Sequence, residues 1–297
     1  MRLIVRSGNS LYIQGIILII LINIIGATTF PLTKEIVSDL SPSALIAARF
    51  IIAAAVFALN LRNINKLLLR DGTILGFLFF LYLAIETVAL QTIPANRAVF
   101  IASLNALIVP LLGWLSGQRV ILRTFIAAGI AVIGIGVMFW EGGELRFGDI
   151  LMLFDAFVYA AYTMFLGRVA SRHPTLTLTS VQLLFIAGLG MVWSNTEIFT
   201  EFATIRQHWG AILYLGLVAT AAVIWLQTLA MRWVPADEAA LLYTLEPLFT
   251  VVFSFWLLGE HLGIRGFMGA VLVLAALILS HTPDKGESKA EVEIQSS

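Results

Sequence analysis

The sequence predicts an all-α membrane protein with ten transmembrane helices, arranged as two inverted five-helix repeats. Three observations lead to this fold class. Hydrophobic residues make up 60% of the 297 residues and charged residues only 12%, with a mean hydropathy of +0.95, whereas soluble proteins carry about 25% charged residues. The apolar residues fall into ten long runs, and a stretch of the first half resembles a stretch of the second half.

The ten runs approach the length of about 20 mostly apolar residues that a helix needs to cross a bilayer. Charged residues or prolines separate them. The first run is too long for a cleavable signal peptide and lacks a small-residue cleavage site, so we expect it to remain as a span. The predicted spans are residues 11–31, 43–60, 72–92, 96–115, 123–140, 148–168, 175–194, 210–231, 236–257 and 265–281.

The distribution of Lys and Arg predicts how the chain is oriented. With the N-terminus in the cytoplasm, the segments on the cytoplasmic side hold twelve Lys and Arg residues and those on the other side hold five. Positive charge collects on the cytoplasmic side of membrane proteins. We therefore expect a multi-pass protein of the cell (inner) membrane, with residues 1–10 and a disordered polar tail, residues 282–297, both in the cytoplasm.

An internal repeat relates spans four and five to spans nine and ten. Residues 94–129 align with residues 235–271 when one extra residue is allowed. Each half, residues 11–140 and residues 148–281, then holds five spans, and an odd number inverts the second half in the membrane. Inverted repeats place binding sites near the midplane between the halves and suit alternating access. The landmarks that match are Pro94 with Pro235, Ala98 with Ala239, Leu104 with Leu245, Asn105 with Glu246, Gly117 with Gly259, and Arg123 with Arg265.

Four sequence stretches resemble the drug/metabolite transporter superfamily of the EamA type. They are "GATTFPLTKE" at the end of span one, "SPSALIAARF" at the start of span two, "AVFIASLNALIVPLLGWLSGQR" over span four and "LEPLFTVVFSFWLLGE" over span nine. The resemblance covers about residues 11–281. It implies a transporter of small metabolites, often an exporter of amino acids or related compounds, and it does not fix the substrate.

Four charged residues lie inside the predicted spans: Arg49, Glu86, Asp155 and Glu246. Exposing all four to lipid would cost roughly 10 kcal/mol on insertion scales, so we expect them to face the interior or one another. Arg49, Glu86 and Asp155 fall at similar depths, about 9 Å from one end of their spans. An ion pair of Arg49 with either carboxylate is therefore expected, as a packing contact, as a site for a zwitterion or as a proton-sensitive gate.

The pair Glu246-Pro247 lies near the middle of span nine. A charged carboxylate is expensive at this depth, which makes Glu246 a candidate for proton coupling or for binding a substrate amino group. Pro247 removes a backbone hydrogen bond near Tyr243 and predicts a helix kink. The other interpretation is a packing kink with a neutral, hydrogen-bonded glutamic acid. Asn105 is the counterpart of Glu246 in the first repeat.

Helical spacing extends the predicted lining of the cavity, because residues three and four apart share a helix face. Tyr243 shares a face with Glu246, and Tyr82 shares one with Glu86. Aromatic rings beside carboxylates suit a substrate with an amine through cation–π contacts, although such rings are also ordinary packing residues. The candidate substrate-binding residues are Asn23, Arg49, Tyr82, Glu86, Asn105, Asp155, Tyr159, Tyr162, Tyr243 and Glu246.

Spans five and ten carry small residues on one face, including Ala131 and Gly134 in span five and Gly266 and Ala270 in span ten. Small residues let membrane helices approach closely. We expect these spans to provide scaffold or dimer contacts, and the protein to act as a monomer or a homodimer.

The remaining motifs argue against other function classes. The chain has no cysteine, its four histidines have no metal-binding spacing, and it has neither a phosphate-binding Gly-rich loop nor a Ser-His-Asp set. We expect no cofactor, no metal and no nucleic acid. A secondary transporter that exports amino acids or similar metabolites, with protons as a candidate partner, is the leading prediction. Import or exchange of nucleosides, sugars or phosphorylated metabolites is the alternative, and a channel or a membrane enzyme has less support.

Overall fold

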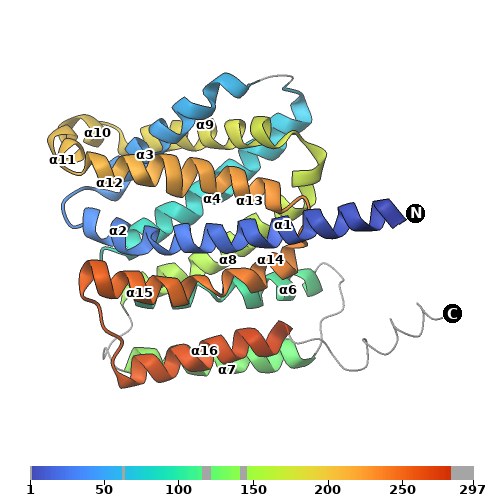
Figure 1. The fold of residues 1–297 in the computed structure, drawn as a ribbon. Helices are drawn as coiled ribbons and strands as arrows, with labels where there is room; N and C mark the ends of the chain where they lie inside the picture. The colour runs from blue at the N-terminus through green and yellow to red at the C-terminus, as the bar shows by residue number, and fades with distance from the viewer. Residues whose placement is uncertain (1, 62–63, 116–121, 141–145, 282–297) are drawn as a thin grey trace.

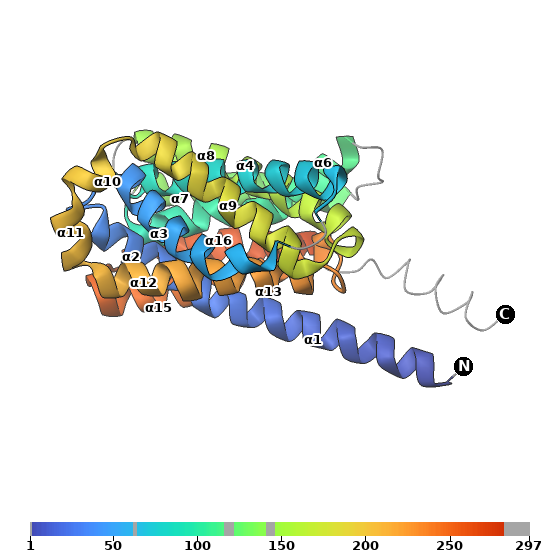
Figure 2. The same cartoon turned by 90° about the horizontal axis from the view of Figure 1, so that it is seen from above.

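The computed structural model describes residues 2–61, 64–115, 122–140 and 146–281, and the chain is helical without β-strands over these ranges. Most of the longer helices run along roughly one common direction, as two views at right angles show (Figure 1, Figure 2). They are α1 (Arg2–Ala27), α2 (Thr29–Ile36), α3 (Pro42–Phe57), α4 (Lys66–Ala89), α5 (Ala95–Ala102), α6 (Asn105–Leu115), α7 (Leu122–Trp140), α8 (Phe147–Val169), α9 (Thr175–Ser194), α10 (Glu197–Thr200), α11 (Phe202–Gln207), α12 (Trp209–Gly216), α13 (Val223–Ala230), α14 (Ala236–Tyr243), α15 (Glu246–Leu258) and α16 (Ile264–His281).

Seven helical spans of the described chain are long and apolar enough to cross a membrane. They are Ser10–Ile36, Lys66–Ala89, Ala95–Trp114, Phe147–Arg172, Thr175–Ser194, Trp209–Ala230 and Glu238–Leu258. Three shorter apolar helical segments are Pro42–Phe57, Phe125–Gly134 and Ile264–Ala276. These ten segments fall on the ten predicted spans, but whether the three shorter ones cross the membrane, and so the total of ten, stays a prediction. The predicted tail, residues 282–297, lies outside the described residues.

Four of the predicted spans are not regular α-helices. Span one bends at Thr28, between α1 and α2, and a π-helical turn, Leu217–Ala222, separates α12 from α13 in span eight. Spans four and nine are interrupted at matching positions, Ser103–Leu104 and Thr244–Leu245. The repeat alignment therefore places the two interruptions at the same point of each half.

The interruption of span nine is not explained by proline alone. Pro247 lies in the first turn of α15, where its missing N–H is tolerated. Span four is interrupted in the same way, although Ala106 stands at the position equivalent to Pro247. There the freed carbonyl groups accept from side chains: the Ser103 hydroxyl donates to the Phe100 carbonyl at 2.7 Å, and the Asn105 amide donates to the Ala102 carbonyl at 2.9 Å. The sequence argument for a kink at Pro247 thus named only part of the cause.

The two interrupted spans lie next to each other in opposite directions. α5 packs against α15 and α14 packs against α6, and α15 and α6 extend toward opposite ends of the molecule (Figure 1). This arrangement brings the two interruptions together near the middle of the bundle. The surrounding wall comes from α1, which packs on α13 and α15, and from α4, which packs against both α8 and α9.

Helices α7 and α16 form a pair along one edge of the molecule (Figure 1). Small residues let their backbones approach closely: a Cβ atom added to Gly134 would lie 2.9 Å from the carbonyl oxygen of Gly269. Ala131 and Ala270 are buried at this edge. The predicted small-residue face is therefore used inside one chain, as a scaffold contact.

Replacing Gly134 with valine is expected to destabilise the α7–α16 pair by about 1–3 kcal/mol, the usual range for overpacking a tight contact. The matched control is Gly136→Val in the same helix, because a Cβ atom there meets nothing within 4 Å. Thermal unfolding in detergent checks this, with a lower unfolding temperature for Gly134→Val than for Gly136→Val. Equal unfolding temperatures would show that the two helices separate easily.

Candidate functional site

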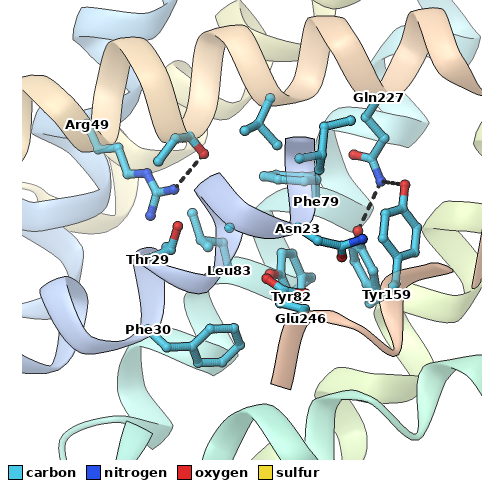
Figure 3. Close-up of a pocket in the computed structure, with 15 residues that line it drawn as sticks. Asn23, Thr29, Phe30, Arg49, Phe79, Tyr82, Leu83, Tyr159, Gln227 and Glu246 are labelled. Carbon is cyan, nitrogen blue, oxygen red and sulfur yellow. Dashed lines mark hydrogen bonds between the residues drawn. The ribbon is translucent and has the colours of Figure 1, made fainter. Parts of the chain in front are cut away.

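A central cavity lies where the two interrupted spans meet (Figure 3). Its first compartment lies mainly against α1, α4 and α13. Its second compartment, which is smaller, lies against α5, α8 and the start of α15. Both compartments are lined by Phe30, Tyr82, Tyr159, Tyr243 and Glu246. We refer to the two compartments together as the central cavity.

Eight of the ten predicted substrate-binding residues line this cavity. The other two, Glu86 and Tyr162, are fully buried behind it. Glu86 follows Tyr82 by one helical turn, and the Tyr162 ring stacks on Tyr159 with centroids 5.9 Å apart. The eight lining residues are Asn23, Arg49, Tyr82, Asn105, Asp155, Tyr159, Tyr243 and Glu246.

Tyrosine rings form one wall of the central cavity. The centroids of Tyr82 and Tyr159 are 4.7 Å apart, and those of Tyr159 and Tyr243 are 5.9 Å apart. Phe79 supports this wall from α4, with its centroid 5.3 Å from that of Tyr82. These distances are those of attractive aromatic pairs, so the rings hold one another in place and present a fixed surface to a ligand.

Gln227 connects two of these rings and was missed by the sequence argument. Its side-chain amide donates to the hydroxyl oxygens of Tyr159, at 2.9 Å, and of Tyr243, at 2.8 Å (Figure 3). Each hydroxyl group, having accepted from Gln227, keeps its own proton to donate. The sequence feature that could have identified Gln227 is its position as a single amide side chain within the apolar span 210–231.

Arg49 lies on the other side of the cavity from Gln227 and Tyr159 (Figure 3). Its Nε donates to the hydroxyl of Thr220, and a terminal guanidinium nitrogen donates to the Ala219 carbonyl at 3.2 Å. Both acceptors belong to the π-helical turn, whose extra residue leaves a carbonyl available. Gly216, just before this turn, allows it to approach, because a Cβ atom there would lie 2.9 Å from the Arg49 carbonyl oxygen.

The expected ion pair of Arg49 with Glu86 or Asp155 does not form in the described part of the chain. Depth along a helix axis says nothing about the direction in which a side chain points. The π-helical turn supplies nearer acceptors than either carboxylate does. Glu86 remains close enough to Arg49 to feel its charge.

Several buried polar atoms around the cavity lack a hydrogen-bond partner within the described residues. They include both carboxylate oxygens of Glu86 and of Asp155, two side chains with no exposed surface, and the amide oxygens of Asn23 and Asn105. The nitrogen of the Asn23 amide donates to the Leu242 carbonyl at 2.9 Å, just before the interruption of span nine. Buried polar groups normally find a partner, so these oxygens are suited to a bound ligand or to water.

Gly26 on α1 makes room for Glu246. A Cβ atom added to Gly26 would lie 2.5 Å from the Oε1 atom of Glu246. We expect Gly26→Ala to displace this flexible side chain with little loss of stability. Transport should fall by about 10- to 100-fold, because moving a functional group by about 1 Å costs up to this factor.

The measurement for Gly26→Ala is the initial rate of transport in proteoliposomes, together with the unfolding temperature. Gly188→Ala is the matched control, since Gly188 is an exposed helical glycine with nothing within 4 Å of an added Cβ atom. Unchanged transport by Gly26→Ala would mean that the position of Glu246 is not critical.

Polar contacts also close the two ends of the bundle around the interrupted spans. Near the start of α5, Arg97 forms a buried ion pair with Asp149 at 2.7 Å. Near the start of α14, the Tyr12 hydroxyl donates to Glu238 at 2.6 Å. Arg97 and Glu238 are equivalent in the repeat alignment. We call these two regions the Arg97 end and the Glu238 end.

The Arg97 end carries further polar contacts. The carboxylate of Glu260 accepts from the backbone N–H groups of Ala95 and Asn96, at 3.0 and 3.1 Å, and so caps the start of α5. The Lys34 ammonium donates to the Leu90 carbonyl at 2.6 Å. The Glu260 contacts tie the segment before α16 to the start of α5, and the Lys34 contact ties α2 to the end of α4.

Within the described residues, no group of three or more His, Asp or Glu side chains is placed to hold a metal ion. Glu86, Asp155 and Glu246 are close enough to affect one another electrostatically. The arrangement is therefore a set of buried carboxyl groups, amides and phenols around a small central cavity.

Comparisons with a family model, with curated relatives and with a solved structure agree with one another. Residues 13–140 and residues 146–282 each match the model of the EamA-like transporter family. An uncharacterized transporter of Archaeoglobus fulgidus is 27% identical over 263 residues, which cover 87% of this chain and 83% of the relative. The uncharacterized transporter YyaM of Bacillus subtilis is 25% identical over 86% of this chain and 90% of its own length. A crystal structure that is 18% identical aligns with a TM-score of 0.63 over 93% of this chain and 96% of the other, which shows a shared fold.

Proposed function

Because the chain belongs to the EamA-like transporter family and is a membrane transporter, we propose that it moves small polar metabolites by alternating access, with export of amino acids or related compounds as its main activity. The observation that carries this proposal is the central cavity at the junction of the two interrupted spans. Discontinuous membrane helices that face a buried polar cavity are typical of secondary transporters.

The proposed mechanism treats the two halves as inverted repeats. Two features support this: both halves match the same family model, and spans four and nine are interrupted at equivalent positions. In alternating access, one end of the bundle opens while the other stays closed. The Arg97–Asp149 pair and the Tyr12–Glu238 pair occupy equivalent places at the two ends, and we assign them to the two gates.

The proposed orientation places the Arg97 end outside the cell and the Glu238 end in the cytoplasm, with both termini inside. Its support is the excess of Lys and Arg on the segments that would then be cytoplasmic. We propose the cell (inner) membrane as the location, and a monomer or homodimer as the working unit.

The proposed source of energy is a proton gradient acting at Glu246. This residue lines both compartments of the cavity and sits directly after the interruption of span nine. The titratable groups around it are Tyr82 and Glu86 from α4, Asp155 and Tyr159 from α8 and Tyr243 from α14, and Arg49 from α3 lines the first compartment.

Exchange of a phosphorylated metabolite is the second candidate, and the cavity argues against it. A multiply charged anion needs several cationic partners. Arg49 is the only Lys or Arg among the described cavity-lining residues, and two carboxylates line the same cavity.

Flux into proteoliposomes tests the proposal. The purified protein is reconstituted and given labelled amino acids, nucleosides, sugars and phosphorylated metabolites, with and without a pH gradient. We expect saturable flux of at least one amino acid above that of protein-free liposomes. Movement of phosphorylated metabolites alone would contradict the amino-acid proposal. Absence of flux for every class, by protein that is still folded, would contradict the transport proposal as applied to small polar metabolites.

A further inference from the structure

We propose that the central cavity selects a small organic cation, a substrate whose ammonium charge is not cancelled by a carboxylate of its own. This inference rests on the proposed transport of small polar metabolites, and among amino acids and related compounds it favours amines over the amino acids themselves. It is carried by three features of the cavity: its charge balance, its buried oxygens without a partner and its aromatic wall.

The charge balance favours a cation. Asp155 and Glu246 line the cavity from α8 and α15, and Glu86 is buried behind Tyr82 within electrostatic range of both. No ion pair compensates these three carboxyl groups within the described chain. Arg49 donates instead to Thr220 and to the Ala219 carbonyl. An unpaired carboxylate is costly to bury, so such a group tends to take up a proton. A bound ammonium group offsets this cost and lets the carboxyl group ionise, which couples binding of a cation to release of a proton.

The hydrogen-bonding groups of the cavity also favour a cation. Among the described residues, the buried atoms that line the cavity without a partner are all oxygens: Asn23 Oδ1, Asn105 Oδ1 and both carboxylate oxygens of Asp155. The cavity also presents donors, namely the hydroxyls of Thr29, Tyr82, Tyr159 and Tyr243 and the part of Arg49 that its acceptors leave available. The oxygens without a partner suit a ligand with N–H donors, and an ammonium group carries three or fewer donors and no acceptor.

The aromatic wall provides the third feature. Tyr82 and Tyr159 line the cavity with Glu246 (Figure 3), and Tyr243 lines the same two compartments. The three rings are held by mutual contacts and by hydrogen bonds from Gln227. The face of an aromatic ring attracts a cation, and the attraction is larger in a desolvated site. An organic ammonium ion can therefore contact the carboxylates with its charge and the rings with its carbon skeleton.

Binding to the purified full-length protein tests the inference with two sets of matched ligands. The first set is tyramine, tyrosine and 3-(4-hydroxyphenyl)propionate, which share a ring but carry positive, zero and negative net charge. The second set is pentylamine, norleucine and hexanoate. Calorimetric titration avoids the passive membrane leakage of amines and fatty acids. We expect the amine to bind at least about tenfold tighter than the zwitterion in one or both sets, the effect of one charge-assisted hydrogen bond, and the acid to bind most weakly.

Variants separate a role in selectivity from a role in folding. Asp155→Asn should reduce the ratio of amine to zwitterion affinity by about tenfold, whereas a purely structural role would lower both affinities together. Glu35→Gln is the control, because Glu35 is an exposed carboxylate near the Arg97 end. It should leave the ratio unchanged.

The inference is overturned if the zwitterion or the acid binds as tightly as the amine in both sets, or if neither amine binds. Its failure is distinguishable from failure of the proposed function. Protein that transports amino acids without preferring amines contradicts only the cation inference, and protein that transports no small polar metabolite contradicts both.

Discussion

Replacing Glu246 with glutamine should abolish the dependence of transport on a pH gradient while leaving some downhill exchange of substrate. Glutamine keeps the size and polarity of the side chain but cannot gain or lose a proton. Glu246 is the only carboxylate of the described chain that lines both compartments of the cavity. It also stands at the interruption of span nine, where a change in its charge can be transmitted to both α14 and α15.

The measurement compares gradient-driven uptake and substrate counterflow in proteoliposomes for the native protein, Glu246→Gln and Glu35→Gln. Counterflow reports binding and conformational change without a need for proton coupling. We expect Glu246→Gln to lose the gradient-driven component and Glu35→Gln to keep it. A normal response to the gradient in Glu246→Gln would assign coupling elsewhere, and Asp155 and Glu86 would then be the next residues to test.

The second large effect is expected from linking either end of the bundle. The native chain has no cysteine, so two introduced cysteines are the only thiols. One variant replaces Arg97 and Asp149, the buried pair of the Arg97 end, and the other replaces Tyr12 and Glu238. A short, reversible, bifunctional thiol reagent should stop transport in both variants, because alternating access requires both ends to open in turn.

Reducing the cross-link should restore the flux, and each single-cysteine variant treated with the same reagent serves as a control. Transport that continues at full rate in the fully linked Arg97–Asp149 variant would remove that pair from the gating mechanism. The same result for the Tyr12–Glu238 variant would remove the other pair.

Much of the secondary structure could be predicted from hydropathy. The span predicted at residues 175–194 coincides with α9, and most other boundaries differ by a few residues. Two predicted starts were wrong by more, because α1 begins at Arg2 instead of residue 11 and α4 begins at Lys66 instead of residue 72. A long apolar run punctuated by charge has few alternatives to a helix in a membrane. The interruption at Ser103–Leu104 could not be predicted in this way, because no proline or glycine marks it, and serine and asparagine side chains replace the missing backbone hydrogen bonds.

Part of the candidate site could be predicted, because charged residues inside apolar spans are easy to recognise in the sequence. Asp155 and Glu246 were found because a carboxylate inside a membrane span needs a reason to be there. Gln227 was missed because an amide inside a membrane span costs less free energy than a charged group does. Its role also depends on two tyrosines from other spans. The predicted ion-pair partner of Arg49 was wrong, because the sequence gives only the depth of a residue along its helix. The actual contacts depend on the rotation of each helix and on a π-helical turn that hydropathy does not reveal.

The most direct test of the account is the accessibility of the central cavity from each side of the membrane. An azide-bearing residue at position Ala102, which lines the second compartment and does not react with thiol reagents, is combined with each linked cysteine pair and treated with a membrane-impermeant alkyne label. With the Arg97 end linked, we predict labelling of the azide at position 102 from the cytoplasmic side only. With the Glu238 end linked, we predict labelling from the opposite side only. Labelling from both sides at once, or from the same side whichever end is linked, would contradict alternating access through this cavity.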